Sequence, residues 1–196
     1  PEISYIKHCN RALLAYAGPS GTIADVASSA TPDRISVYVV RPGDTLSEIA
    51  GMRIWLKRDD LQRTGSFKER GARHALLCLT DAERASGVIA ASAGNHALGL
   101  AYHSAQLGVR VTVVMPVNAP FVKVARCRSL GAEVVLHGNS FEEALAAAHE
   151  RAVATGATPI HPFDDLRVIA GQGTMALEIL EQAPELDTIV VPVGGG

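Results

Sequence analysis

One lysine stands in a local sequence that could support chemistry. Lys68 lies in "RTGSFKERGA", residues 63–72, between a glycine-serine turn and an arginine-glycine pair. Ser66 and Glu69 have the spacing of a capping box that opens a helix. Lys68 is therefore predicted in the first helical turn, where the positive end of the macrodipole lowers the pKa of its amine. Such an amine attacks carbonyl groups; the alternative is a solvated lysine at a helix start.

A second candidate is the turn "ASAGNHA", residues 91–97, which follows one predicted strand and opens a predicted helix. Backbone N–H groups converge in such a turn and bind anions, for example a carboxylate. Gly94 lets a ligand approach the backbone, while Ser92 and Asn95 offer hydrogen bonds from their side chains. The alternative is a capped turn in which His96 is merely a helix-start residue.

A third candidate is "VPVGGG", residues 191–196, where a predicted buried strand runs into three glycines. Parallel α/β proteins use this arrangement to cradle phosphate. The alternative is a flexible terminus. Two other lysines have ordinary explanations: Lys57 alternates with Leu56 in a predicted strand, and Lys123 lies on the polar side of a predicted helix.

The elements that must position these residues alternate between strand and helix, which is typical of a parallel α/β fold. Strands are predicted at residues 53–60, 87–92, 109–116, 132–138 and 188–193, with a buried strand-like segment at 159–163. Helices are predicted at residues 68–79, 93–108, 121–130, 141–154 and 166–180. Gly108, Gly131 and Gly156 suit the left-handed stops that end three of these helices.

Polar residues near the helix starts suggest how those helices begin. Asn118 is predicted to cap the helix that follows Pro120, and Ser140 with Glu143 forms a second capping box. The adjacent Asp164 and Asp165 are interpreted as caps of the helix 166–180. Within that helix Gly171 and Gly173 indicate close packing, because glycine otherwise costs about 1 kcal/mol there.

Composition narrows the function classes. The chain has 196 residues, 47% of them hydrophobic, and a formal net charge of -2, which argues against partners such as nucleic acid or an anionic membrane. Three scattered cysteines and seven histidines show no disulfide or metal-ligand spacing, so we predict no metal site. The sequence has neither a membrane-spanning apolar run nor a signal-peptide core, and we expect a cytoplasmic protein with a small-molecule partner.

The combination of these motifs resembles the fold-type II pyridoxal-phosphate enzymes, within them the group of threonine dehydratase and serine racemase. The matching segments are "IWLKRDDLQRTGSFKERGA", "AASAGNHALGLAY", "VVMPVNAPFVKVARCRSLGAEVVLHGNSFEEA", "HPFDDLRVIAGQGTMALEIL" and "VPVGGG", in family order. The resemblance implies an α/β fold of doubly wound parallel sheets, like that of the tryptophan synthase β subunit. It implies a small domain at residues 85–157, parts of a larger cofactor-binding domain at 53–84 and 158–196, and a poorly matching segment at 1–52.

The resemblance also implies roles for particular residues. Lys68 would form a Schiff base with pyridoxal 5'-phosphate and later remove the α-proton of the substrate, with Phe67 packed near the cofactor ring. Asn95 would hydrogen-bond the 3-hydroxyl of that ring. The substrate carboxylate would be bound by Ser92, Ala93, Gly94, Asn95 and His96, and the cofactor phosphate by Gly194, Gly195 and Gly196.

The reaction implied is β-elimination from L-threonine, and from L-serine, to a 2-oxo acid and ammonia, as in isoleucine biosynthesis. Racemases of this group carry a second serine where this chain has Ala93, which favours elimination over serine racemisation. For the full-length protein the resemblance implies a homo-oligomer.

Two features depart from the family pattern. The family continues beyond the glycine loop, so we expect an incomplete fold and little or no activity from residues 1–196 alone. The stretch "VYVVRPGDTLSEIAG", residues 37–51, resembles the opening of a LysM module. The rival interpretation is therefore a non-catalytic remnant or a glycan-binding protein.

Overall fold

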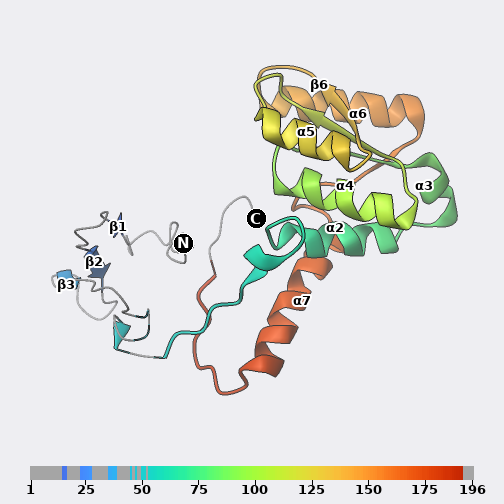
Figure 1. The fold of residues 1–196 in the computed structure, drawn as a ribbon. Helices are drawn as coiled ribbons and strands as arrows, with labels where there is room; N and C mark the ends of the chain where they lie inside the picture. The colour runs from blue at the N-terminus through green and yellow to red at the C-terminus, as the bar shows by residue number, and fades with distance from the viewer. Residues whose placement is uncertain are drawn as a thin grey trace. The chain divides into compact units, whose positions relative to one another are not determined.

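The computed structural model describes residues 15–16, 23–27, 35–38, 45, 47, 50–51 and 53–191 (Figure 1). The chain divides into two compact units, Arg58–Pro184 and a second unit of Pro1–Lys57 with Glu185–Gly196. The predicted glycine loop at 194–196 lies outside the described residues, and so does most of the LysM-like stretch at 37–51. The predicted division into domains at residues 85 and 158 stays a prediction.

The unit that contains both chain ends holds a small antiparallel sheet. Its strands are β1 (Ala15–Tyr16), β2 (Ile23–Ala27) and β3 (Ile35–Tyr38), in the order β1-β2-β3. The strands predicted at 53–60 and 188–193 are wrong over their described parts, since residues 53–58 and 188–191 have no regular structure. A β-branched run supplies strand propensity, but a strand also needs a hydrogen-bonded neighbour.

The unit Arg58–Pro184 has the α/β architecture predicted from the sequence. Its four-stranded parallel sheet has the order β6-β5-β4-β7. The strands are β4 (Val88–Ala91), β5 (Val111–Met115), β6 (Glu133–Leu136) and β7 (Thr158–Pro159). The helices are η2 (Asp59–Leu61), α2 (Lys68–Leu77), α3 (Asp81–Ser86), α4 (Asn95–Leu107), α5 (Phe121–Ser129), α6 (Phe141–Thr155) and α7 (Leu166–Gln182). The buried segment predicted at 159–163 contributes only Pro159 to a strand, although Ile160 is buried.

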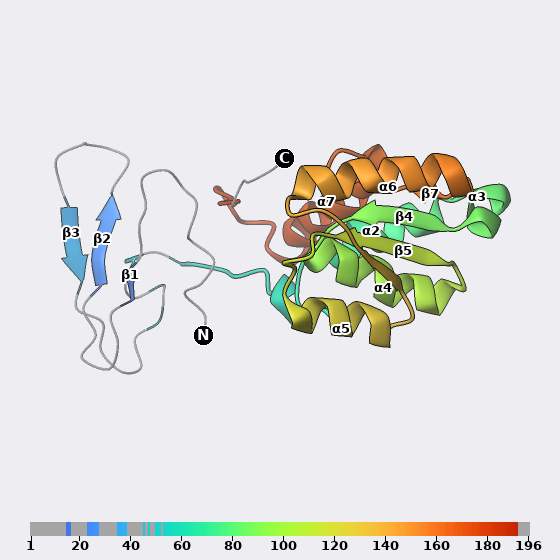
Figure 2. The same ribbon diagram turned by 90° about the horizontal axis from the view of Figure 1, so that it is seen from above.

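Helices cover both faces of this sheet, as Figure 2 shows with α6 on one side and α4 and α5 on the other. Successive residues of β4 point to opposite faces. Val88 and Ala90 pack in the core beneath α4 and α5, whereas Ile89 and Ala91 pack against alanines of α6. All four side chains are buried, as expected for a parallel sheet covered on both faces.

Glycines let α2 pack closely between α4 and α7. A Cβ on Gly171 of α7 would lie 2.6 Å from the Cα of Gly71, and one on Gly99 of α4 would lie 3.1 Å from the Cβ of Ala72. The close packing predicted at Gly171 is confirmed. The same prediction for Gly173 is wrong, because a Cβ there would meet nothing within 4 Å. The close approach of the three helices positions the N-terminal end of α2, where Lys68 lies.

The predicted helix boundaries hold at their C-terminal ends. Gly108, Gly131 and Gly156 all have positive φ, and Gly108 and Gly156 are left-handed C-caps. At the N-terminal ends, Ser140 caps α6, but the predicted capping box is only half formed, because the Oε2 of Glu143 accepts from the backbone N–H of Asn139 at 2.7 Å and not from that of Ser140. Asn118 does not cap α5, whose N-cap is Pro120. Asn118 instead donates from Nδ2 to the carbonyl oxygen of Asn139, 3.3 Å away.

Candidate active site

The candidate residues gather at the carboxyl ends of β4 and β7. The turn after β4 leads into α4, and residues 160–163 follow β7. The first turn of α2 meets both segments. Strands β4 and β7 are parallel neighbours, so the segments that leave their carboxyl ends emerge at the same edge of the sheet. Ligands of open α/β sheets bind at this edge.

Lys68 is the first residue of α2, as predicted, and its amine is half-buried. Its Nζ donates to the carbonyl oxygen of Pro162 at 2.7 Å. The amine also lies 5.3 Å from the ring centre of Phe67 and 5.9 Å from that of Phe163. Burial lowers the pKa of Lys68. The predicted direction is confirmed, but desolvation replaces the helix dipole as its cause, which brings the amine closer to the neutral, nucleophilic form.

The turn before Lys68 is held differently from the predicted capping box. The Oε2 of Glu69 accepts hydrogen bonds from Thr64, 2.9 Å from its backbone N and 3.0 Å from its Oγ1. Glu69 therefore does not cap with Ser66, and Phe67, the N-cap of α2, makes no side-chain hydrogen bond. The buried Oγ of Ser66 has no partner within the described part of the chain. A free hydroxyl and uncapped N–H groups thus lie beside Lys68.

The turn at residues 92–96 presents unused backbone donors. The Oγ of Ser92 accepts from the N–H groups of Gly94 and Ala97, with N–O distances of 3.3 and 3.4 Å. Within the residues that the structure describes, the N–H groups of Ala93, Asn95 and His96 have no acceptor. A Cβ built on Gly94 would meet nothing within 4 Å, so open space adjoins this backbone. Both observations fit the predicted anion site.

His96 is more than a helix-start residue. Its imidazole is 2% exposed, and its Nε2 lies 3.4 Å from the carbonyl oxygen of Ile160. A carbonyl only accepts, so Nε2 carries the hydrogen and Nδ1 is left with a lone pair. That buried Nδ1 has no partner among the described residues. Burial lowers the pKa of His96 to about 4, so the ring is neutral at pH 7.

Asn95 has a partner that sequence reasoning missed. Its Oδ1 accepts a hydrogen bond from Nζ of Lys123, a residue of α5, at 2.8 Å. The sequence marked Lys123 only as a residue of a polar helix face. A hint was present in the order of the elements, since α5 follows β5 and therefore begins at the same edge of the sheet as α4.

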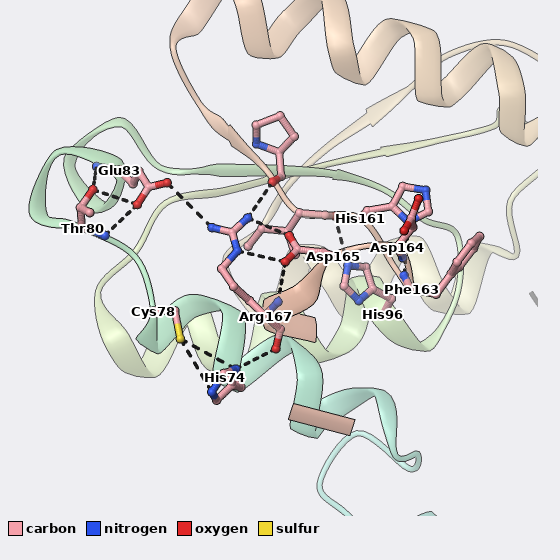
Figure 3. A network of polar contacts seen from close by, with 12 residues as sticks. His74, Cys78, Thr80, Glu83, His96, His161, Phe163, Asp164, Asp165 and Arg167 are labelled. Carbon is pink, nitrogen blue, oxygen red and sulfur yellow. Dashed lines mark hydrogen bonds and ion pairs between the residues drawn. The ribbon is translucent and has the colours of Figure 1, made fainter. Parts of the chain in front are cut away.

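A network of hydrogen bonds and ion pairs holds the segment that accepts the hydrogen bond of Lys68 (Figure 3). Asp165 caps α7, as predicted for the pair Asp164 and Asp165, by accepting from the backbone N–H of Arg167 at 2.8 Å. The Asp165 carboxylate also binds the guanidinium of Arg167 at 2.7 and 3.0 Å. Arg167 in turn lies 3.4 Å from the carbonyl oxygen of Pro159 and 3.8 Å from Glu83. Residues 160–165 are thus tied at their C-terminal end to the sheet and to α3.

The structure brings together the predicted residues that it describes. Lys68 and Phe67 lie on one side and the turn 92–96 on the other, with His96 and Lys68 both reaching carbonyls of residues 160–162. Gly194, Gly195 and Gly196 lie outside the described residues. Among the described residues, no cluster of three metal-ligating side chains occurs, and no helix is long and apolar enough to cross a membrane.

The donor set fits a pyridoxal-phosphate site. It contains an amine of lowered pKa flanked by aromatic rings, free N–H groups that suit a carboxylate, and an amide that suits a ring hydroxyl. Five buried side-chain atoms have no hydrogen-bond partner among the described residues, and two of them, Ser66 Oγ and His96 Nδ1, lie in the segments that form the candidate site, which indicates that polar partners are missing there.

Comparison with known sequences agrees with a pyridoxal-phosphate site. The model of the family "Pyridoxal-phosphate dependent enzyme" matches residues 40–196. An L-threonine ammonia-lyase of Thermotoga maritima is 52% identical over 151 residues, which cover 77% of this chain and 38% of that protein. The biosynthetic L-threonine dehydratase of Pasteurella multocida is 47% identical over 182 residues, 92% of this chain and 36% of that protein. This chain therefore spans less than half the length of these relatives.

Solved structures resemble the fold as well. The processed form of threonine deaminase isoform 2 from Solanum lycopersicum matches with a TM-score of 0.74 and 43% identity, over 76% of this chain and 41% of that one. Serine racemase from Dictyostelium discoideum matches with a TM-score of 0.73 and 42% identity, over 76% of this chain and 49% of that one. The predicted fold class is confirmed, for a part of the length of these proteins.

Proposed function

Because the chain belongs to the family of pyridoxal-phosphate dependent enzymes, we propose that it carries the lysine and substrate-binding half of a threonine ammonia-lyase. The reaction is β-elimination from L-threonine, and from L-serine, to a 2-oxo acid and ammonia. The observation that carries the proposal is the half-buried amine of Lys68, of lowered pKa, beside a turn with three free N–H groups. The names of the similar proteins support the choice of reaction.

When bound, the cofactor supplies the electron sink that makes the Cα–H bond of an amino acid acidic. Lys68 is the residue placed to attach it, because neutral amines condense with aldehydes and burial favours the neutral form of this amine. The same Nζ is then the group that takes the α-proton. The ring centres of Phe67 and Phe163 both lie within 6 Å of Nζ and give the amine apolar neighbours.

Substrate orientation falls to the turn after β4. The N–H groups of Ala93, Asn95 and His96 have no acceptor among the described residues, and open space adjoins Gly94 between them, so we expect them to bind the substrate carboxylate at the positive end of α4. Ser92 keeps the turn in shape by accepting from Gly94 and Ala97. Binding at this turn holds the α-carbon at a constant position relative to Lys68.

Contacts with the ring and phosphate complete the proposal. Asn95 offers Nδ2 to the 3-hydroxyl of the cofactor ring, since its Oδ1 is already occupied by Lys123. The assignment of Gly194, Gly195 and Gly196 to the cofactor phosphate follows from the resemblance alone and stays a prediction, because these residues lie outside the described part of the chain.

Serine racemisation is the second candidate, favoured by the similarity to the Dictyostelium discoideum racemase. Racemisation needs a proton donor on the face of the substrate opposite to Lys68. Ala93 has no proton to give at the position where the resemblance places that donor. We therefore propose elimination as the main reaction.

The wider biology follows from the resemblance alone. Participation in isoleucine biosynthesis, a cytoplasmic location, a homo-oligomer of the full-length protein and weak activity of residues 1–196 by themselves stay predictions.

Borohydride trapping tests the proposal. The protein is incubated with pyridoxal phosphate, reduced, digested and analysed by mass spectrometry, with Lys68→Ala and Lys57→Ala as matched variants. We expect one labelled peptide containing Lys68, no label in Lys68→Ala and normal labelling in Lys57→Ala. Label on another lysine, or none, would refute the proposal and favour the non-catalytic remnant. Threonine and serine added to the full-length enzyme should yield 2-oxo acid in excess of D-amino acid.

A further inference from the structure

A contact between α5 and α4 involves a residue that the proposed reaction does not use. Nζ of Lys123 donates to Oδ1 of Asn95 at 2.8 Å. Asn95 is the first residue of α4, and Lys123 lies in the first turn of α5. The two side chains thus meet at the edge of the sheet where the candidate site lies.

Lysine imposes a direction on the asparagine amide. An amide has one acceptor oxygen and a nitrogen with two donor hydrogens, whereas a lysine ammonium only donates. The amide could otherwise turn over and exchange its oxygen and nitrogen. With Lys123 on the oxygen, Nδ2 and its hydrogens must point to the opposite side, and the cation strengthens their donor character by polarising the amide.

The docking of α5 does not depend on this contact. Val124 and Cys127, on the neighbouring turns of α5, are 5% and 0% exposed and belong to the core shared with α4 and the sheet. The free energy that holds α5 in place therefore comes from apolar burial. An exposed hydrogen bond such as that of Lys123 adds little to stability, so its location beside the site calls for another explanation.

We propose that Lys123 is a positioning residue that orients Asn95, so that Nδ2 of Asn95 donates to the 3-oxygen of the cofactor ring. This inference rests on the proposed function. Without Lys123 the amide rotates freely and spends part of its time with Oδ1 toward the ring, where two oxygens repel each other. The cofactor then binds less tightly, and its absorbance changes because the 3-oxygen loses a fixed donor.

The test compares cofactor binding in matched variants. The dissociation constant of pyridoxal phosphate and the visible spectrum of the bound cofactor are measured for Lys123→Met, Lys123→Arg and the control Arg128→Met. Arg128 is an exposed cation of the same helix. We expect Lys123→Met to weaken binding about five- to tenfold, the effect of one oriented hydrogen bond, and to change the spectrum. Lys123→Arg should restore both properties, and Arg128→Met should change neither.

A double-mutant cycle identifies the route of the effect. If Lys123 acts through Asn95, then Lys123→Met has no further effect in an Asn95→Ala background. Equal effects in both backgrounds, or a Lys123→Met protein with unchanged affinity and spectrum, would overturn the inference. If Lys123→Met fails to fold, Asn95→Asp decides. Its carboxylate keeps the contact with Lys123 but has no hydrogen to donate, so cofactor affinity must fall although the fold is retained.

Borohydride labelling of Lys68 accompanies every measurement. Label at Lys68 in all variants, with no change in affinity on loss of Lys123, refutes the role of Lys123 alone. Absence of label in the wild-type protein refutes the proposed function together with this inference.

Discussion

Helices of the unit Arg58–Pro184 begin in two different ways. At the start of α3 the Oγ1 of Thr80 accepts from the N–H of Glu83 at 3.3 Å, and at the start of α6 the Oγ of Ser140 accepts from that of Glu143 at 3.2 Å. By contrast, the N-cap residues of α2 and α4, Phe67 and Gly94, make no side-chain cap hydrogen bond. In α4 the Oγ of Ser92, two residues before the N-cap, accepts from the N–H of Ala97. A cap contributes about 1 kcal/mol, so its absence from two long, buried helices has a cost.

Two of the helices whose N-cap makes no side-chain hydrogen bond, α2 and α4, form the candidate site; α5, with Pro120 as its N-cap, also lacks a side-chain cap. Helix N-termini satisfy their free N–H groups with caps, water or ligands. Lys68 lies in α2, and the turn at 92–96 leads into α4. The comparison suggests that these helix starts lack the stabilising effect of a cap because anionic groups bind there. The start of α7 differs from those of α2 and α4. It lies beside the same loop, yet the carboxylate of Asp165 caps it, so an anion already occupies that end.

The largest effect is expected from pH, through His96 in the uncapped helix α4. Its pKa in the folded protein is about 4, below the ordinary 6.5. Between these pH values the unfolded chain binds a proton that the folded chain does not. The free energy of unfolding should therefore fall as pH drops from 7, by on the order of 3 kcal/mol, and this loss levels off below pH 4. Denaturant unfolding at a series of pH values measures it.

The matched variant for this experiment is His96→Gln, which keeps a side-chain amide donor for the carbonyl of Ile160 but has no titratable group. Its free energy of unfolding should depend less steeply on pH between 4 and 6.5 than that of the wild type. Parallel profiles for the two proteins would show that His96 is not the buried neutral group described above.

A carboxylate cap added to α4 should increase the stability of the fold and weaken the binding of substrate. In Gly94→Asp the new side chain has room, since a Cβ there meets nothing within 4 Å. It should raise the free energy of unfolding by about 0.5 kcal/mol. It should also weaken binding of an amino-acid substrate about 100-fold, because a negative charge replaces the substrate carboxylate. Thermal unfolding and substrate titration of the cofactor-loaded, full-length enzyme provide the two readouts.

Gly94→Ala is the control for that change, since it adds a Cβ without charge. Its effect on binding should be much smaller than that of aspartate. Equal losses in the two variants would mean that the turn is sensitive to size alone and would contradict an anion site.

Removal of the cap of α6 should lower stability without affecting cofactor binding. Ser140→Ala in α6 should lower the free energy of unfolding by about 1 kcal/mol, because the N–H of Glu143 loses its acceptor. The dissociation constant of pyridoxal phosphate should not change. If cofactor affinity fell as much as in the site variants, the distinction between capped and uncapped helix starts would not hold.

The smallest effect is expected at α3. Thr80→Ala removes one side of a complete capping box. However, α3 has six residues and none of them is buried, so its fraying costs little. We expect a loss of about 0.5 kcal/mol in the free energy of unfolding, measured by denaturant titration beside Ser140→Ala. A larger loss than at Ser140 would reverse the predicted order.

Local patterns in the sequence were enough for strands β4, β5 and β6 and for helices α2, α4, α5, α6 and α7, whereas the short helices η2 and α3 were not predicted. The apolar runs that became β4, β5 and β6 were found because each is followed by a helical period and a turn residue. The run at 188–191 has the same composition but no strand, because pairing, and not propensity, decides whether a run becomes a strand. The pattern Ser66 to Glu69 failed for a related reason, since Thr64 competes for the same carboxylate.

The sequence by itself determined where most helices and strands of the parallel α/β unit lie and which residues are chemically suited to the site, among them Lys68 and the turn at 92–96. It could do so because apolar period, glycine stops and caps act over a few neighbouring residues. Only the tertiary structure decided which groups meet. Nζ of Lys68 reaches the carbonyl of a residue 94 positions away, and Asn95 meets a lysine 28 positions away. The first contact depends on how the segment after β7 lies against α2, and the second on how α5 lies against α4, and no pattern within one element encodes which elements become neighbours.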